Sequence, residues 1–212
     1  MDLPAAIPLF PLPDHVLLPG VASPYRLFEP RYRALAAALD ALPEASRFLA
    51  IPRLATSNLA TEGGREQVAP VAALTIARQL TFQADGTWLL VAEGVARVAL
   101  TPVICDTPFR QAAVTLLPDQ PEDSGDLATL IDGVRGLASH FRLLLGERGA
   151  LLDAVLVQPE PVLLIDQLGA LLLGPADERQ AFLEERRASA RALRVRQVLL
   201  RLTGSRGEPS LN

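Results

Sequence analysis

The chain has 212 residues, half of them hydrophobic, and its 20 basic and 24 acidic residues give a net charge of −4. This composition excludes disorder over most of the chain, and the negative charge provides no overall attraction to nucleic acid or anionic membranes. All basic residues are arginine, so the chain cannot supply the lysine that Walker A loops, Ser-Lys hydrolases and Schiff-base enzymes require.

The chain opens with the proline-rich apolar stretch IPLFPLPDHVLLPG at residues 7–20. A secretory signal needs a basic start and an unbroken apolar run, and proline interrupts every run here. No apolar stretch reaches the roughly 18 to 20 residues that cross a bilayer. The single cysteine, Cys105, cannot form an internal disulfide, which suits a reducing compartment. We therefore predict a soluble cytoplasmic protein without membrane partners, in which the prolines mark short extended segments.

A helix is predicted from Pro30, a residue that fits the first helical position. One face of this helix is apolar at the spacing i, i+3, i+4, i+7, which is formed by Tyr32, Leu35, Ala36 and Leu39. Residues 47–51 then form a short apolar run that predicts a buried strand. Residues 53–67 are polar and rich in glycine, which predicts a loop.

The next segment has the pattern of β-structure. Apolar runs at 74–82 and 87–92 flank the sequence QADG, and an Asp-Gly pair between such runs predicts a hairpin. We expect a break at Glu93 and Gly94, followed by strands at 95–100 and 111–117. Pro102 and Pro108 are expected at strand edges because proline has no N–H to donate.

After an acidic, proline-containing stretch at 118–125 the apolar period becomes helical. Helices are predicted over residues 127–145 and from Pro161 to 172, and the last helices are predicted between about 176 and 202. The resulting organisation is a β-rich domain at 1–118, a linker at 119–125, a helical bundle at 126–203 and a disordered tail at 204–212.

Several segments together resemble the N-terminal substrate-binding domain of Lon proteases, in order and spacing over residues 7–117. The helical segment at 160–202 is similar to the bundle that follows in that family. The form LFEPRYR at 27–33 is typical of short, stand-alone members. The segments that carry the resemblance are IPLFPL at 7–12, VLLPG at 16–20, YRLFEPRYR at 25–33, VAALTI at 71–76, Asp85-Gly86, and VAEGVAR at 91–97.

The resemblance implies an α+β protein, with a PUA-like mixed β pseudo-barrel and one helix followed by a C-terminal helical bundle. The opening prolines would then belong to edge strands that enter the barrel while resisting further pairing. The implied function is non-catalytic binding of unfolded or extended polypeptides, without a cofactor and with a separate ATP-dependent protease as a possible partner. Neither the ATPase lysine nor the Ser-Lys peptidase pair of the full-length enzymes is present.

Five residues near the predicted helix are candidates to contact a polypeptide: Tyr25, Phe28, Glu29, Arg31 and Tyr32. An exposed strand edge or an apolar groove would capture the polypeptide there. The three aromatic residues have an equally good explanation as core between helix and barrel. Glu29 and Arg31 are better explained by capping the helix and by bridging it to the barrel.

Three further hypotheses carry less weight. Asp14, His15 and Ser23 contain the side chains of a hydrolytic triad, but no G-x-S-x-G nucleophile elbow occurs. Two distant histidines and one cysteine make a metal site a poor explanation. The alternative function is RNA binding by an arginine stripe on the last helix, although acidic neighbours favour a solvated helix face. That stripe consists of Arg187, Arg191, Arg194 and Arg201.

Overall fold

We analysed a computed structural model, which describes residues 3–54, 61–62 and 65–204. The chain divides into two compact units, which we call the sheet unit (Met1–Pro118) and the helical unit (Asp119–Asn212). Most of the predicted polar loop at 53–67, and all but the first residue of the predicted tail at 204–212, lie outside the described residues.

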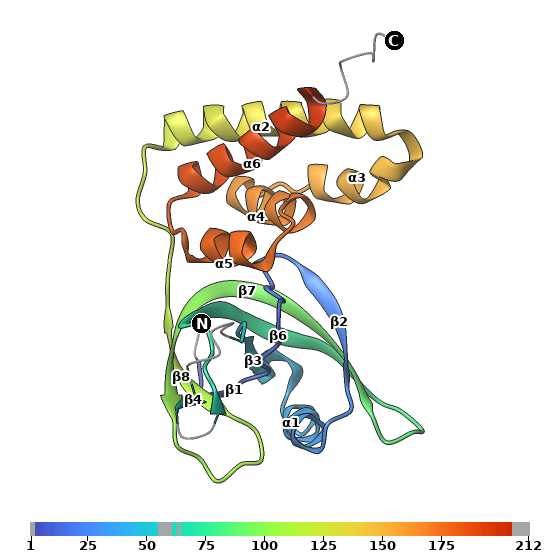
Figure 1. Cartoon of the computed structure of the whole chain (residues 1–212), viewed down its shortest axis with the longest axis vertical. Coiled ribbons are helices and arrows are strands. Elements are labelled where there is room, and N and C mark those ends of the chain that lie inside the picture. The colour runs from blue at the N-terminus through green and yellow to red at the C-terminus, as the bar shows by residue number, and fades with distance from the viewer. Residues whose placement is uncertain (1–2, 55–60, 63–64, 205–212) are drawn as a thin grey trace. The chain divides into compact units, whose positions relative to one another are not determined.

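The sheet unit is built on one six-stranded sheet, in which five strands follow the order β1-β8-β7-β6-β3 and β2 pairs with β7 (Figure 1). All strand pairs in it are antiparallel, and they confirm the predicted α+β class together with the helices. The strands are β1 (Ile7–Pro8), β2 (Ala22–Leu27), β3 (Phe48–Ile51), β6 (Val71–Phe82), β7 (Trp88–Val103) and β8 (Gln111–Leu116); β4 (Thr61–Glu62) and β5 (Arg65–Glu66) form a separate pair.

The proline-rich opening closes this sheet. Leu9 N–H donates to the carbonyl of Arg110 before β8 (2.8 Å), whereas Phe10 N–H donates to the carbonyl of Ala50 in β3 (2.9 Å). Leu12 N–H continues along the same side to the carbonyl of Pro52 (3.0 Å). Successive residues therefore bond to strands at the two ends of the strand order, as expected of an edge segment that enters the barrel.

The hairpin between β6 and β7 is confirmed, with Gln83 N–H donating to the Thr87 carbonyl (2.8 Å) and Gly86 at a φ of 80°. The predicted break at Glu93 and Gly94 is wrong, because β7 runs through it as one strand of 16 residues. Gly94 serves a close approach instead: a Cβ there would lie 2.4 Å from the carbonyl oxygen of Leu18.

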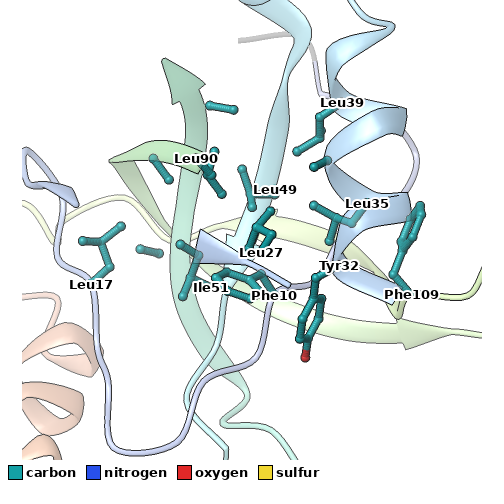
Figure 2. Close-up of a cluster of buried hydrophobic side chains, with 14 residues drawn as sticks. Phe10, Leu17, Leu27, Tyr32, Leu35, Leu39, Leu49, Ile51, Leu90 and Phe109 are labelled. Carbon is teal, nitrogen blue, oxygen red and sulfur yellow. The ribbon is translucent and has the colours of Figure 1, made fainter. Parts of the chain in front are cut away.

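Helix α1 (Pro30–Asp40) packs its predicted face into the sheet unit. All four residues of that face are buried, which confirms the helical period. They join a cluster that also contains Phe10 of the closing segment (residues 7–12), Leu49 of β3 and Leu90 of β7 (Figure 2). A second apolar cluster is formed by residues of β1, β3, β6, β7 and β8. The short 3₁₀ turn η1 (Glu44–Ser46) connects α1 towards β3.

The helical unit contains α2 (Ser124–Leu145), α3 (Ala150–Leu156), α4 (Pro161–Leu172), α5 (Ala176–Glu184) and α6 (Ala188–Gly204), with the turn η2 (Gly146–Gly149) between α2 and α3. The predicted helices at 127–145 and from Pro161 to 172 are confirmed, whereas α3 was not predicted. Among the described residues, none of these helices is long and apolar enough to span a bilayer.

Candidate functional site

Tyr32 belongs to the core of the sheet unit and is not a surface contact. Its side chain is 7% exposed, and its ring packs edge-on against Phe10 with the centroids 4.8 Å apart. Figure 2 shows the ring beside Phe10, with the hydroxyl pointing away from Leu35. The guanidinium of Arg31 lies 4.5 Å from the centre of the same ring. Of the two explanations considered for Tyr32, the structure therefore supports core packing.

Tyr25 is half-buried and fixed by hydrogen bonding. Its hydroxyl lies 2.8 Å from His15 Nε2, and its ring packs edge-on against those of Phe10 and His15. Burial raises the pKa of Tyr25 to about 12, partly opposed by a hydrogen bond with Ser23. Asp14 lies 3.5 Å from Arg53. His15 and Asp14 thus contact Tyr25 and Arg53 respectively.

The remaining predicted contacts lie on the surface where β2 leads into α1. The Phe28 side chain is 65% exposed. Glu29 occupies the N-cap position of α1 but makes no side-chain cap, which corrects the expectation that it caps the helix. Its carboxylate instead accepts a hydrogen bond from Arg31 Nε at 2.8 Å. An exposed aromatic side chain is therefore followed by an exposed ion pair.

Two aromatic residues that the sequence analysis did not select lie on the hairpin. Phe82 is 62% exposed and packs against Trp88, with ring centroids 5.3 Å apart. Leu27 of β2 is opposite Trp88, and Trp88 is opposite Phe82, so the three residues form one row across three strands. Phe82 directly precedes the QADG turn and Trp88 follows it after Thr87, and the hairpin places these two residues opposite each other.

We call Phe28, Phe82 and Trp88 the aromatic end of the sheet unit. Leu27 and Phe82 are two strand spacings apart, about 10 Å, and Phe28 directly follows Leu27. Arg33 of helix α1 also approaches this end: a Cβ atom on Gly86 would lie 3.6 Å from Arg33 Nη1. The aromatic end thus combines Phe28, which follows β2, with Phe82 of β6 and Trp88 of β7, which come more than 50 positions later in the sequence.

The hairpin turn beside the aromatic end is held by polar contacts. Asp85 Oδ1 accepts hydrogen bonds from the backbone N–H (3.0 Å) and the hydroxyl (2.6 Å) of Thr87. These bonds, together with an ion pair to Arg26, lower the pKa of Asp85. The turn that carries Phe82 and Trp88 is consequently an ordered support.

The predicted arginine stripe is not one continuous exposed surface on α6, because Arg187 precedes that helix and Arg191 is buried. The Arg191 side chain has no exposed area, whereas Arg201 is exposed and Arg194 is half-buried. Arg187 pairs with Glu185 at 2.9 Å. The stripe is interrupted at its second member, because that side chain is drawn into the helical unit by carboxylates. The RNA-binding alternative loses the surface on which it depended.

Arg191 is the centre of a buried charge network. Its two terminal nitrogens donate to the two carboxylate oxygens of Asp119 at 2.8 and 3.0 Å, and Nη1 also donates to the carbonyl of Glu185 at 2.9 Å. Its Nε lies 3.0 Å from Asp166, whose side chain is 2% exposed. Burial would lower the pKa of Arg191, but the two aspartates outweigh it and raise that pKa. The network ties the segment before α2 to α4 and α6.

In the part of the chain that the structure describes, His, Cys, Asp and Glu side chains form no group of three or more that could hold a metal ion. Cys105 is half-buried, and the Thr107 hydroxyl donates to its sulfur at 3.2 Å.

Comparisons with known proteins agree with this architecture. A family model described as the ATP-dependent protease La (LON) substrate-binding domain matches residues 6–201. A Lon protease of Desulfosudis oleivorans is 22% identical over 186 residues, which cover 86% of this chain but 22% of that protein. The chain therefore spans about a fifth of the length of this curated relative.

Two solved structures are similar in fold. One is the N-terminal domain of a Lon protease from the Mycobacterium avium complex, with a TM-score of 0.67 and 22% identity, over 94% of this chain and 98% of that one. The other is a Lon N-terminal domain protein from Xanthomonas campestris, with a TM-score of 0.61 and 21% identity, over 91% of this chain and 97% of that one.

Proposed function

The chain belongs to the Lon substrate-binding domain family, and we propose that it is a non-catalytic module that binds unfolded or extended polypeptides at the aromatic end of its sheet unit. The observation that carries this proposal is the exposure of Phe28 and Phe82, at 65% and 62%. Aromatic side chains release a large apolar area from water when a partner covers them, and they dominate binding energy at many interfaces.

The support around the aromatic end favours binding by a preformed surface. The turn is held by Asp85 and Thr87, and Trp88 packs both on Phe82 and on the buried cluster beneath α1. A side chain that is already ordered loses little entropy when a ligand covers it. Glu29 and Arg31 add an exposed ion pair beside Phe28, and we place them at the polar rim of the surface.

We further propose that a separate ATP-dependent protease in the cytoplasm receives the bound polypeptide. The relative from Desulfosudis oleivorans is a Lon protease, and this chain corresponds to a fifth of it. This chain has no lysine, so the phosphate-binding lysine of an ATPase would have to come from a partner.

The test is a fluorescence-anisotropy titration with a fluorescein-labelled, reduced and carboxymethylated polypeptide that cannot refold. We expect Phe28→Ser and Phe82→Ser each to weaken binding about 10-fold, the effect of losing one interface anchor. Leu143→Ser is the matched control, because Leu143 is an apolar residue of the helical unit that is 76% exposed. Equal losses in all three variants, or no binding by the unaltered chain, would contradict the proposal.

A further inference from the structure

We infer that the polypeptide binds as an added β-strand on the open edge of β6, where it pairs with the backbone of Leu80 and Phe82. This inference rests on the proposed function and specifies how the ligand is held. Three observations support it. They are which residues of the hairpin bond to β7, how far β3 extends along β6, and how the edge of β2 differs from that of β6.

The hairpin fixes which backbone groups of β6 are free. Gln83 N–H donates to the Thr87 carbonyl, so Gln83 and Thr87 are a hydrogen-bonded pair. Such pairs alternate along an antiparallel ladder. Thr81, opposite Leu89, is therefore bonded to β7, whereas Leu80 and Phe82 direct their N–H and C=O groups away from β7. Two donors and two acceptors lie along this edge at the spacing of a β-strand.

Strand β3 covers only the first part of the edge. It pairs with β6 from Ala73 to Ile76, and the last bond on this side joins Ala77 N–H to the Arg47 carbonyl at 2.9 Å. The chain before Arg47 then leaves the sheet as the 3₁₀ turn η1. Within the described residues no strand pairs with this edge of β6 beyond Ala77, and Figure 1 shows the hairpin running on past the end of β3.

The edge of β2 provides an internal contrast. Gly94 N–H donates to the Val21 carbonyl at 2.9 Å, so by alternation Ser23, Tyr25 and Leu27 bond to β7, and residues 22, 24 and 26 face outward. Residue 24 is proline and residue 26 is arginine. Proline removes the central donor, and both residues are typical of protected edges. The corresponding segment of β6, Gln79 to Phe82, contains no proline and no charge.

The chemistry of the open edge identifies its occupant. Leu80 and Phe82 point to the same face of the sheet as Trp88, because residues opposite each other share a face. An incoming strand in the antiparallel direction, which β3 takes on the same edge, would place its own side chains about 5 Å from theirs. The occupant is thus an extended segment with apolar residues at alternate positions and with an N–H on each of them.

Amide hydrogen exchange of the whole chain, with and without the carboxymethylated polypeptide, tests this inference directly. In the free protein we expect Leu80 and Phe82 to exchange fast and Thr81 to exchange slowly. On binding, Leu80 and Phe82 should slow at least about 10-fold, and Ala22 and Arg26 on the edge of β2 should not change.

A second measurement uses the octapeptide Glu-Thr-Val-Thr-Val-Thr-Val-Arg and two N-methylated forms of it. Methyl groups on the valine nitrogens remove the donors that would face β6, and we expect at least about a 10-fold loss of affinity. Methyl groups on the threonine nitrogens point away from β6 and should change affinity less than about threefold. The two forms have equal length and charge, so each is the control for the other.

The outcomes separate the two proposals. Slowed exchange at Leu80 and Phe82 supports strand addition. Suppose that Phe82→Ser abolishes polypeptide binding, but that binding to the unaltered chain leaves the exchange of the Leu80 and Phe82 amides unchanged. This result overturns strand addition and leaves the proposed function standing. Equal affinities of the two methylated octapeptides would also overturn it. Failure of the polypeptide to bind at all overturns the proposed function and this inference together.

Discussion

The sheet unit and the helical unit are each stabilised internally by a different kind of interaction. The sheet unit has two apolar clusters, and the larger one collects side chains from α1, the closing segment and the central strands. The helical unit also buries apolar side chains, but it places a fully buried arginine between Asp119 and Asp166. Apolar packing tolerates many substitutions of similar volume, whereas a buried ion network depends on each of its members. The helical unit should therefore be the more sensitive to single polar changes.

Trp88 makes this comparison measurable, because it is the only tryptophan of the chain and lies in the sheet unit. Its fluorescence reports on the sheet unit, while circular dichroism at 222 nm is dominated by helices. Urea unfolding followed by both signals assigns each destabilisation to a unit. Coincident shifts of the two transitions in every variant would show that the units unfold as one, and would remove the basis of the comparison.

The largest effect is expected from Arg191→Met. It removes the cation that pairs with the buried carboxylate of Asp166, and removal of one member of a buried pair costs about 3–5 kcal/mol. The helical transition should move to lower urea while the Trp88 transition stays in place. Arg196→Met, at an exposed position of the same helix, is the control and should change stability by less than about 0.5 kcal/mol. Adding Asp166→Asn to Arg191→Met should recover part of the loss.

Gly94→Ala is the corresponding test of the sheet unit. The added Cβ would lie 2.4 Å from the Leu18 carbonyl oxygen, and overpacking of this kind costs about 1–3 kcal/mol. The Trp88 transition should be the one that shifts. Gly133→Ala on α2, where a Cβ meets nothing within 4 Å, should instead stabilise the helical transition by about 1 kcal/mol. A neutral Gly94→Ala would show that the strand can move away from Leu18.

A smaller effect is expected at the start of α2. Asp123 accepts hydrogen bonds from the backbone N–H groups of Gly125 (2.9 Å) and Asp126 (3.3 Å). Asp123→Ala removes this cap and should cost the helical transition about 1 kcal/mol, whereas Asp123→Ser keeps an acceptor and should cost less than half of that. Equal losses in the two variants would contradict a capping role.

The smallest predicted effect is a pH dependence from Glu185. Hydrogen bonds from the side chain and backbone of Arg187 lower the pKa of Glu185 from 4.5 to about 2. A lowered folded-state pKa stabilises the protein above pH 4.5, and this contribution is lost as the pH falls from 4.5 towards 2. The pair is partly exposed, so we expect less than about 1 kcal/mol. The difference in helical stability between the unaltered chain and Glu185→Gln should shrink over this pH range; a constant difference would contradict it.

Features determined by a few neighbouring residues could be predicted from the sequence. The hairpin at Asp85 and Gly86 and the inner face of α1 depend on local turn chemistry and on the helical period, and both predictions are confirmed. Gly94 has the same local signature as a turn glycine, but its role depends on Leu18, 76 positions earlier in the chain. Local patterns cannot distinguish a glycine that turns the chain from one that admits another backbone.

Charged residues show the same limit more strongly. Four arginines at helical spacing predicted a common surface, but the acceptor that buries Arg191 is Asp119, 72 positions away. At the site, the sequence identified Phe28 as a candidate contact, and the structure places it on the surface. It also selected Tyr32, which is core, and did not select Phe82, which is 62% exposed and lies beyond the part of β6 that pairs with β3. The periodicity of one strand does not reveal how far a neighbouring strand extends along it.

The closing segment has a consequence for the order of folding. Ile7 pairs with Ala112, more than 100 positions later in the chain, and the next residues bond to β3. During synthesis, the closing segment cannot pair with β8 until β8 has left the ribosome, although its other neighbour, β3, has already been made. Contacts of such long sequence separation slow folding, so the sheet unit should complete its fold late. Proline at residues 8 and 11 keeps the waiting segment extended, with fewer donors for incorrect partners.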